Sequence, residues 1–421
     1  MDRLRIIGGT PLFGSVDISG AKNAALPILF ATILSDQKSI VKNVPLLADI
    51  NTTLKVLDAL GLKTLFKLEN HTLEIDGSSL NSHEAPYELV RTMRASVLVL
   101  GPLLARKGIA KVSLPGGCAI GARPVDIHLM ALEKLGATFK LEGGYIEGSA
   151  VNGLSGSKIE FPFPSVGATE NTLMACVLAK GKSEIHNVAR EPEIVDLVIA
   201  LRSMGAKISG EGTSTIHIEG VSSLHGMNHN VAPDRIEAAT FLCAGLITQG
   251  KVTVNGISAD YMTTALDLLS KAGAKITDTP DSITAEYVGE LTSLNITTEP
   301  FPGFPTDMQA QFMALLTQAN GHSKISETIF ENRFMHVPEL IRLGSKIKIK
   351  GNEAELEGPI KLTGATVMAT DLRASASLII AGLAAKGETF IRRIYHLDRG
   401  YEQIEHKFSK LGAKIFRELE K

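Results

Sequence analysis

The heptapeptide LGAKIFR at residues 411–417 is the last copy of a pattern that decides the fold of this 421-residue chain. The pattern is an apolar residue, a glycine and a small or apolar residue, followed by a strand-like run. Its glycines recur at intervals of 68 to 75 residues, at Gly61, Gly136, Gly205, Gly273, Gly344 and Gly412. Such a period indicates copies of one supersecondary element. Six repeats of about 70 residues therefore fill nearly the whole sequence.

Each repeat also contains a helix-like segment that is apolar or small on all sides. These segments lie at 23–34, 92–105, 170–179, 235–247, 308–319 and 372–385. A helix without a polar face is normally buried on every side. Five segments are followed by a glycine near a strand start, which fits the left-handed residue that ends a helix. These glycines are Gly108, Gly181, Gly250, Gly321 and Gly387.

A second, amphipathic helix precedes each signature glycine. In the last repeat, Ile404, Phe408 and Leu411 share one helical face. Two alternating strands follow the signature, as at 345–358. The predicted order is helix, strand, helix, strand, strand, with the apolar helices inside and the sheets outside. Six repeats can close as one ring or as two groups of three; the polar segment 220–233 resembles a linker and favours two domains.

Composition excludes several classes of protein. Lys plus Arg is 43 and Asp plus Glu is 45, so the net charge of −2 argues against nucleic acid as the main partner. Three cysteines provide no disulfide framework. The N-terminus has no apolar core of signal-peptide length. The longest apolar stretch, 24–34, is far shorter than the ~20 residues of a membrane span. We expect a cytoplasmic protein.

Polar residues gather where the apolar helices are expected to begin. Buried helix N-termini offer unpaired N–H groups and partial positive charge, so with Lys or Arg they favour phosphate or carboxylate binding. The alternative is that Asp307 and Asp371 are ordinary N-caps. The residues concerned are Lys22, Asn23, Arg91, Arg94, Ser165 to Glu170, Asp234, Arg235, Asp307, Asp371 and Arg373.

The strand-to-helix loops form a second equivalent set. They carry Arg123, Arg190, Arg333 and Arg399. Equivalent loops of a symmetric repeat converge in space, so these arginines are expected to share one cleft. The alternative is that they are ordinary surface residues.

The loop 115–124 (PGGCAIGARP) is the sharpest local feature. Its glycines permit conformations that other residues resist. Cys118 between them is not a routine core residue, and nearby Arg123 favours a thiolate. Cys176 and Cys243 lie inside apolar helices and are predicted to be packing residues.

Other motifs carry no chemistry. Gly116, Gly117 and Gly121 form no phosphate loop, because no Gly-Lys-Ser/Thr follows them. His225 and His229 are surrounded by turn residues, which argues against a helical zinc site.

Long motifs across the whole chain resemble the enolpyruvyl transferase family, and within it the members that act on UDP-N-acetylglucosamine. The motifs are GAKNAALP (20–27), PGGCAIGARPVD (115–126), SVGATEN (165–171), REPEIVD (190–196), FPTDMQAQF (304–312), FENRFMHVPEL (330–340), ATDLRASASL (369–378) and YHLDRGYE (395–402). The resemblance implies an α/β fold, a two-domain inverted α/β barrel of six βαβαββ-type repeats, three per domain. The expected domains are 21–230, which carries the Cys118 loop, and 1–20 plus 231–421, with the active site in the cleft between them.

The resemblance also implies a reaction. The enolpyruvyl group of phosphoenolpyruvate is transferred to the 3′-hydroxyl of UDP-N-acetylglucosamine with release of phosphate, through a tetrahedral ketal. This is the first committed step of peptidoglycan precursor synthesis. The implied partners are these two small substrates, without nucleic acid or membrane. The chemistry requires no metal and no organic cofactor.

Residue roles come from the same resemblance. Cys118 matches the general acid and Asp307 the carboxylate that takes the hydroxyl proton, while Lys22, Arg123 and Arg399 match the cationic pocket for phosphoenolpyruvate. The sugar-nucleotide and neighbouring positions are Asn23, Arg94, Arg123, Pro124, Val125, Asp126, Ile127, Ser165, Val166, Gly167, Asp307 and Ile329. Further cleft residues are Arg333, Asp371 and Arg373.

One position departs from the family, and two rival functions stay open. Phe163 stands where some members place a phosphate-binding lysine, so backbone N–H groups of 165–167 are expected to serve instead. The enzyme rival is the related synthase that acts on shikimate 3-phosphate. The other rival is a non-catalytic ring or scaffold. The Cys118 loop argues against both.

Overall fold

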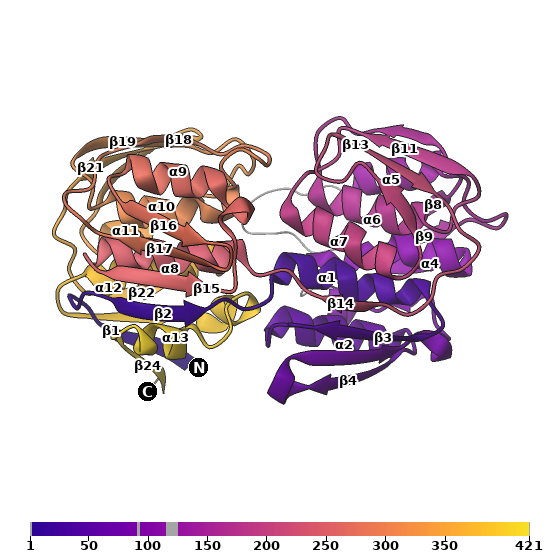
Figure 1. Cartoon of the computed structure of the whole chain (residues 1–421), viewed down its shortest axis with the longest axis horizontal. Coiled ribbons are helices and arrows are strands. Elements are labelled where there is room, and N and C mark those ends of the chain that lie inside the picture. Colours follow the sequence, from indigo (N-terminus) through magenta and orange to yellow (C-terminus); the bar gives the residue numbers. More distant parts are fainter. Residues whose placement is uncertain (1, 91–92, 115–124, 421) are drawn as a thin grey trace. The chain divides into compact units, whose positions relative to one another are not determined.

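The computed structural model describes residues 2–90, 93–114 and 125–420, apart from the side chain of Arg94. The described residues form two compact units. Unit 1 contains residues 2–19 and 233–420, and unit 2 contains residues 20–90, 93–114 and 125–232. Each unit holds three four-stranded sheets (Figure 1).

The third repeat shows the architecture of the copies most simply. It runs β10 (Lys158–Glu160), α6 (Val166–Cys176), β11 (Lys182–His186), α7 (Pro192–Ser203), β12 (Lys207–Ser209) and β13 (Thr215–Glu219). The sheet order is β10-β11-β13-β12, with β10 parallel to β11 and the other pairs antiparallel. The predicted βαβαββ repeat is therefore confirmed.

The second and fifth repeats keep this order. The second contains β6 (Glu84–Ala85), α3 (Tyr87–Val90), η4 (Arg94–Val99), α4 (Leu100–Lys107), β7 (Ile109–Ser113), α5 (Asp126–Lys134), β8 (Thr138–Glu142) and β9 (Tyr145–Ser149). The fifth contains β18 (Asn295–Thr297), η6 (Thr306–Met308), α10 (Gln309–Leu316), β19 (Gly321–Ser326), α11 (Val337–Arg342), β20 (Lys346–Lys350) and β21 (Glu353–Gly358).

The first, fourth and sixth repeats each contribute three strands to a sheet whose fourth strand comes from a distant part of the chain. The first contains α1 (Lys22–Ala31), η1 (Thr32–Leu34), β3 (Lys38–Lys42), α2 (Ala48–Ala59), β4 (Lys63–Lys67), η2 (Leu68–Asn70), β5 (Thr72–Asp76) and η3 (Gly77–Ser79). The fourth contains α8 (Arg235–Ile247), β15 (Lys251–Asn255), η5 (Ala259–Tyr261), α9 (Thr263–Lys271), β16 (Lys275–Thr279) and β17 (Ser282–Glu286). The sixth contains β22 (Thr366–Met368), α12 (Leu372–Ala384), β23 (Glu388–Arg392), η7 (Ile394–Arg399), α13 (Ile404–Lys410) and β24 (Lys414–Leu419).

In each of these three repeats, one strand from a distant part of the chain completes the four-stranded sheet. The N-terminal strand β1 (Asp2–Ile7) pairs with both β23 and β24. The next strand, β2 (Phe13–Asp17), is parallel to β15 and lies beside it in Figure 1. In unit 2, β14 (Asn228–Asn230) is parallel to β3. The interpretation of 220–233 as a polar linker was therefore wrong for its second half, because β14 belongs to a sheet and Met227 and Val231 are buried.

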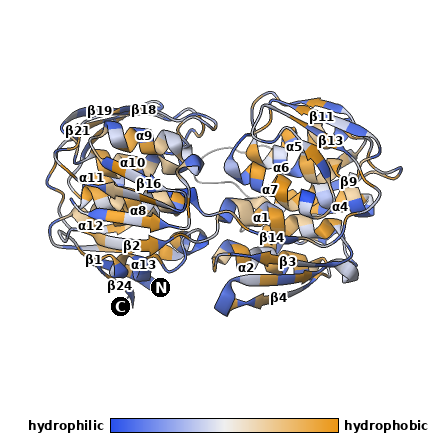
Figure 2. Ribbon diagram, viewed as in Figure 1, coloured by the Kyte–Doolittle hydropathy of each residue, from blue (hydrophilic) through white to orange (hydrophobic). Residues whose placement is uncertain are grey.

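Apolar helices form the centre of each unit, as predicted. In unit 1, α8, α10 and α12 pack against one another. In unit 2, α6 packs against α1 and α4. Apolar residues, orange in Figure 2, run along these helices and alternate with polar residues on the strands. Every residue of α8 is buried, including Cys243, and Cys176 in α6 is buried too, so both cysteines are packing residues.

The signature glycines have a backbone reason. All six have φ between 96° and 99°, a left-handed conformation that side chains disfavour. The prediction for helix-ending glycines is confirmed at Gly108, the left-handed C-cap of α4. Gly181, Gly321 and Gly387 are also left-handed, but they lie two to four residues beyond the helix C-caps, at or just before the start of the next strand. The prediction is wrong at Gly250. There Gln249 is left-handed, with φ of 59°. Gly250 is instead required by close approach, because a Cβ would lie 1.9 Å from the carbonyl oxygen of Leu12.

Candidate active site

Charged groups meet where the three central helices of unit 1 begin. Asp307 lies in η6, directly before α10, and Arg373 is the second residue of α12. Asp307 Oδ2 accepts a hydrogen bond of 3.0 Å from Arg373 Nη2. Its Oδ1 accepts one of 2.7 Å from Arg333 Nη2, which comes from the loop after β19. Two predicted cleft arginines thus hold the predicted base.

The accessibility of this cluster is uneven. The side chains of Arg333 and Arg373 are 3% and 5% exposed, whereas that of Asp307 is 28% exposed. Burial alone would raise the pKa of Asp307, but Arg373 and Arg333 lower that pKa well below its ordinary value. Asp307 is therefore ionised at neutral pH and presents a carboxylate on its exposed side.

Asp371 caps a helix, whereas Asp307 caps none in the described part of the chain. Asp371 Oδ1 accepts from the backbone N–H groups of Arg373 at 2.8 Å and Ala374 at 3.0 Å, so it is the N-cap of α12. Asp307 makes no side-chain cap in the described residues and is held by arginines instead. Sequence alone left both interpretations open for these two residues, and the structure shows capping for Asp371.

Two histidines accompany this cluster. His336, the residue before α11, is 1% exposed, and burial lowers its pKa to about 4, although Asp371 acts in the opposite direction. His396 lies in η7, and partial burial followed by the charge of Arg399 lowers its pKa. Arg399 is half-buried at the end of η7. Sequence reasoning had assigned no role to either histidine.

The predicted lysine of unit 2 is paired with an acid that the sequence analysis missed. Lys22 begins α1, and its Nζ lies 2.5 Å from Oδ2 of Asp49 in the first turn of α2. The two residues are 8% and 3% exposed. Asn23 is half-buried beside Lys22. A buried ion pair of this kind fixes the ammonium group in one place.

The N-terminus of α6 is the second feature of unit 2. Ser165 is the N-cap, and its hydroxyl accepts from Ala168 N at 3.4 Å. A Cβ on Gly167 would lie 3.2 Å from the His128 ring. Asn171 Nδ2 lies 3.1 Å from His128 Nδ1, and its Oδ1 accepts from Gly101 N. Because an amide nitrogen only donates, Nδ1 of His128 accepts, and burial lowers the His128 pKa to about 4.

Other predicted positions lie on described loops and helix starts. Ile329 is 38% exposed, and its backbone N–H donates to Glu327 Oε1 at 2.9 Å. Glu327 also accepts from the Thr306 hydroxyl at 2.8 Å, so it ties the Ile329 loop to the segment before Asp307. Asp126 is exposed at the start of α5, between Val125 and the buried Ile127. Val166 is half-buried at the start of α6, and Phe163 is 54% exposed.

Some predicted residues lie outside the described part of the chain. They are Arg91, Cys118, Arg123, Pro124 and the side chain of Arg94. Arg190 is described and half-buried. Among the described residues, no group of three or more His, Cys, Asp or Glu is arranged to hold a metal ion. No helix in the described ranges is long and apolar enough to cross a membrane.

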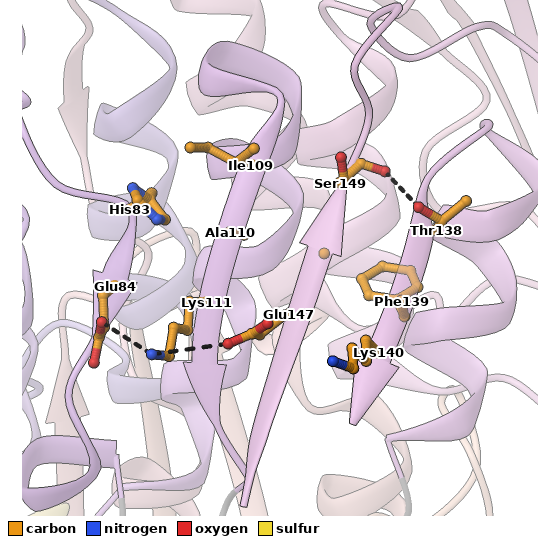
Figure 3. Close-up of a pocket in the computed structure, with 11 residues that line it drawn as sticks. His83, Glu84, Ile109, Ala110, Lys111, Thr138, Phe139, Lys140, Glu147 and Ser149 are labelled. Atoms are coloured by element: carbon orange, nitrogen blue, oxygen red, sulfur yellow. Dashed lines mark hydrogen bonds and ion pairs between the residues drawn. The ribbon is translucent and has the colours of Figure 1, made fainter. Parts of the chain in front are cut away.

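A hollow of about 550 Å³ lies against the sheet of β6, β7, β9 and β8 in unit 2, and none of the described predicted site residues lines it. Figure 3 shows Lys111 between Glu84 and Glu147, at 3.4 Å and 3.8 Å. Lys140 is paired with Glu142. These ion pairs neutralise the cations of the hollow, so it is a poor anion site.

Comparisons with known proteins fit this geometry. The family EPSP synthase (3-phosphoshikimate 1-carboxyvinyltransferase) matches residues 6–408. A protein of Desulfovibrio desulfuricans named UDP-N-acetylglucosamine 1-carboxyvinyltransferase is 56% identical over 419 residues, covering 99% of this chain and 100% of the relative. One of Gluconacetobacter diazotrophicus with the same name is 55% identical, covering 99% of each chain. The chain belongs to the enolpyruvyl transferase family.

Solved structures agree with this membership. The enolpyruvyl transferase NikO from Streptomyces tendae superposes with a TM-score of 0.90 at 26% identity, covering 100% of this chain and 99% of the other. EPSP synthase from Acinetobacter baumannii has a TM-score of 0.76 at 18% identity over 100% of both chains, which shows a shared fold. The predictions of an α/β enolpyruvyl transferase fold and of a transferase are therefore confirmed.

Proposed function

We propose a division of labour among the residues of this enolpyruvyl transferase. The chain transfers the enolpyruvyl group of phosphoenolpyruvate to the 3′-hydroxyl of UDP-N-acetylglucosamine and releases phosphate, the first committed step of peptidoglycan precursor synthesis. The observation that carries this function is full-length identity of 53–56% to relatives named for that reaction.

The reaction is an addition followed by an elimination. The 3′-oxygen bonds to C-2 of phosphoenolpyruvate while the double-bond electrons take a proton at C-3. The resulting ketal then loses the C-2–phosphate bond, and phosphate leaves with the electron pair. Loss of a proton from C-3 restores the double bond. We assign the proton delivered to C-3 to Cys118, which lies outside the described residues.

Asp307 is the group that we assign to the 3′-hydroxyl proton. Its carboxylate is ionised and partly exposed, as a proton acceptor must be. Its lowered pKa makes it a weak base. A weak base suffices if the hydroxyl proton leaves only as the oxygen bonds to C-2, because that oxygen becomes strongly acidic at this point.

Phosphoenolpyruvate carries phosphate and carboxylate groups that need cations. We assign them to Lys22, Arg123 and Arg399, with Arg333, Asp371 and Arg373 shaping the neighbouring surface. Lys22 is held by Asp49, so its position is set before the substrate binds. Fixed cations stabilise developing negative charge without reorganising during the reaction.

The sugar nucleotide is assigned to a different set. Its diphosphate would meet the N-terminus of α6 at Ser165, Val166 and Gly167, where backbone N–H groups and the helix dipole favour anions. This replaces the lysine contact that Phe163 removes. Neighbouring positions that complete this assignment are Asn23, Arg94, Arg123, Pro124, Val125, Asp126, Ile127, Asp307 and Ile329.

The proposed enzyme has two domains and acts in the cytoplasm without a cofactor. We assign the active site to the cleft between domains 21–230 and 1–20 plus 231–421. Substrates that are cytoplasmic metabolites place the enzyme in the cytoplasm. Neither a metal nor an organic cofactor takes part in the steps above.

Phosphate release tests the function and separates it from both rivals. Purified chain is mixed with phosphoenolpyruvate alone, with added UDP-N-acetylglucosamine, or with added shikimate 3-phosphate. We expect release only with the sugar nucleotide. Release only with shikimate 3-phosphate would establish the synthase rival, and no release with either would favour the scaffold.

A further inference from the structure

A buried polar network lies beneath Asp307 and joins two central helices of unit 1, α8 and α10, to the segment after η7. It consists of Thr240 in α8, Gln311 in α10 and Tyr401 after η7. The Thr240 and Tyr401 hydroxyl oxygens are 2.8 Å apart. Gln311 Nε2 lies 3.3 Å from each of them. Thr240 and Gln311 are 0% exposed and Tyr401 is 2% exposed, so no solvent competes for these bonds.

The donor of each bond follows from the available protons. The Thr240 hydroxyl donates to the Ile236 carbonyl at 2.8 Å. A hydroxyl has one proton, so Thr240 accepts from Tyr401. The Tyr401 oxygen in turn accepts from Gln311 Nε2. Gln311 Nε2 only donates, and its two protons serve three acceptors, which are the two hydroxyl oxygens and the Asp307 carbonyl. Each contact in the network therefore has one direction.

The network reaches Asp307 by two routes. Gln311 Nε2 donates to the backbone carbonyl of Asp307 at 3.0 Å. The guanidinium carbon of Arg373 lies 5.8 Å from the centre of the Tyr401 ring, and Arg373 donates to the Asp307 carboxylate. The circuit from Asp307 through Gln311, Tyr401 and Arg373 back to Asp307 is closed.

We infer that Tyr401 and Gln311 are positioning residues for the transfer reaction. Gln311 fixes the backbone of Asp307, and Tyr401 fixes the guanidinium of Arg373 against its carboxylate. Neither side chain reaches solvent, so neither touches a substrate. The inference rests on the proposed role of Asp307 as proton acceptor.

The Tyr401 hydroxyl is bonded to Thr240 and Gln311, and these bonds hold the ring against Arg373. Loss of the hydroxyl would free the ring and so loosen the pairing of Arg373 with Asp307. Arg373 and Arg333 lower the pKa of Asp307 against the effect of burial. Burial lowers the pKa of Arg373, whereas Asp307 and then Tyr401 and Asp234 raise it. With Arg373 less well placed, the pKa of Asp307 would rise towards its ordinary value. A carboxylate that must be ionised to act would then lose function at a higher pH.

The test compares Tyr401→Phe with the wild-type chain and with Tyr287→Phe, which removes a hydroxyl elsewhere in unit 1. We expect Tyr401→Phe to lower kcat about 10-fold with KM values changed less than about 2-fold. Its acid limb of kcat/KM would move to higher pH, whereas that of Tyr287→Phe would not. Thr240→Val, which removes the acceptor of the Tyr401 proton, should move the limb in the same direction and serves if Tyr401→Phe does not fold.

The outcomes distinguish the inference from the proposed function. A lower melting temperature with unchanged kcat and acid limb would make the network merely structural and overturn the inference. If Asp307→Asn abolishes transfer while the network variants behave as wild type, the inference fails and the proposed role of Asp307 stands. Wild-type activity of Asp307→Asn would overturn both.

Discussion

Asp307 in unit 1 and Lys22 in unit 2 are both charged groups near the start of a central helix, yet they are held differently. Two arginines donate to Asp307, which keeps a 28% exposed side chain. Lys22 is paired with Asp49, and both are almost fully buried. Both charges have counter-ions, so the contrast is one of exposure: part of the Asp307 side chain is open to solvent, whereas Lys22 and Asp49 are both almost fully buried.

The largest effect is expected at Asp307. Asp307→Asn keeps the shape but removes the proton acceptor and leaves Arg333 and Arg373 without their carboxylate. General-base catalysis contributes roughly 10²–10⁴-fold, so we expect the transfer rate to fall about 1000-fold. Phosphate release measures it. A loss under about 10-fold would contradict the role of Asp307.

Variants of the Lys22–Asp49 pair can distinguish an effect on stability from an effect on activity. Lys22→Met removes the ammonium group that pairs with the buried Asp49 carboxylate, so the free energy of unfolding should fall by about 3 kcal/mol in urea. The double variant Lys22→Met with Asp49→Leu removes both charges and should recover most of that loss. It should not recover activity, because the cation remains absent. Recovered activity would make Lys22 purely structural.

The two units also carry equivalent histidines, and a pH titration can compare them. His128 and His336 each stand eight residues before a signature glycine, and burial lowers both pKa values to about 4. The unfolded chain binds a proton near pH 6.5, whereas the folded chain does not until about pH 4. Stability therefore falls as pH drops from 6.5 to 4, by up to about 3 kcal/mol for each histidine.

His128→Asn provides the measurement in unit 2. The asparagine oxygen can replace Nδ1 as acceptor for Asn171 but takes up no proton in this range. We expect the loss of unfolding free energy between pH 7 and pH 4 to shrink by up to about 3 kcal/mol relative to wild type. If the variant and the wild-type chain lose the same unfolding free energy between pH 7 and pH 4, the pKa of His128 is not lowered in the folded chain, and the prediction is wrong.

The smallest effect is expected inside α10. Gln309 is 0% exposed, and neither amide atom has a hydrogen-bond partner among the described residues. Removing an unsatisfied buried amide is neutral or stabilising, so Gln309→Met should raise the free energy of unfolding by up to about 1 kcal/mol. Gln311→Met is the matched control and should destabilise, since Gln311 Nε2 is bonded. Equal effects of the two variants would contradict the network.

Local sequence patterns predicted the six repeats, but not which distant strands complete the sheets of three of them. The signature glycines mark a left-handed turn in every copy, so six repeats could be found from spacing alone. The pairing of β2 with β15 and of β14 with β3 joins segments about 200 residues apart, and short strands carry no signal for such partners. For this reason the segment 220–233 was taken for a linker.

The site was predictable in residue type and less so in role. Capping stayed an open alternative for Asp307 because the arginines that hold it are 26 and 66 residues away in the sequence. Polar residues within an apolar helix, such as Gln309 and Gln311, were the available signal for the buried network. Asp49 and Glu327 had none, because acids in loops and first helical turns are common.

A crystal structure of the chain with UDP-N-acetylglucosamine, without phosphoenolpyruvate, tests the central claim most directly. We predict that the sugar 3′-hydroxyl lies about 3 Å from the Asp307 carboxylate. The diphosphate should contact the backbone N–H groups of Ser165 to Gly167. A 3′-hydroxyl beyond hydrogen-bond distance of Asp307, or a diphosphate away from the start of α6, would contradict the account.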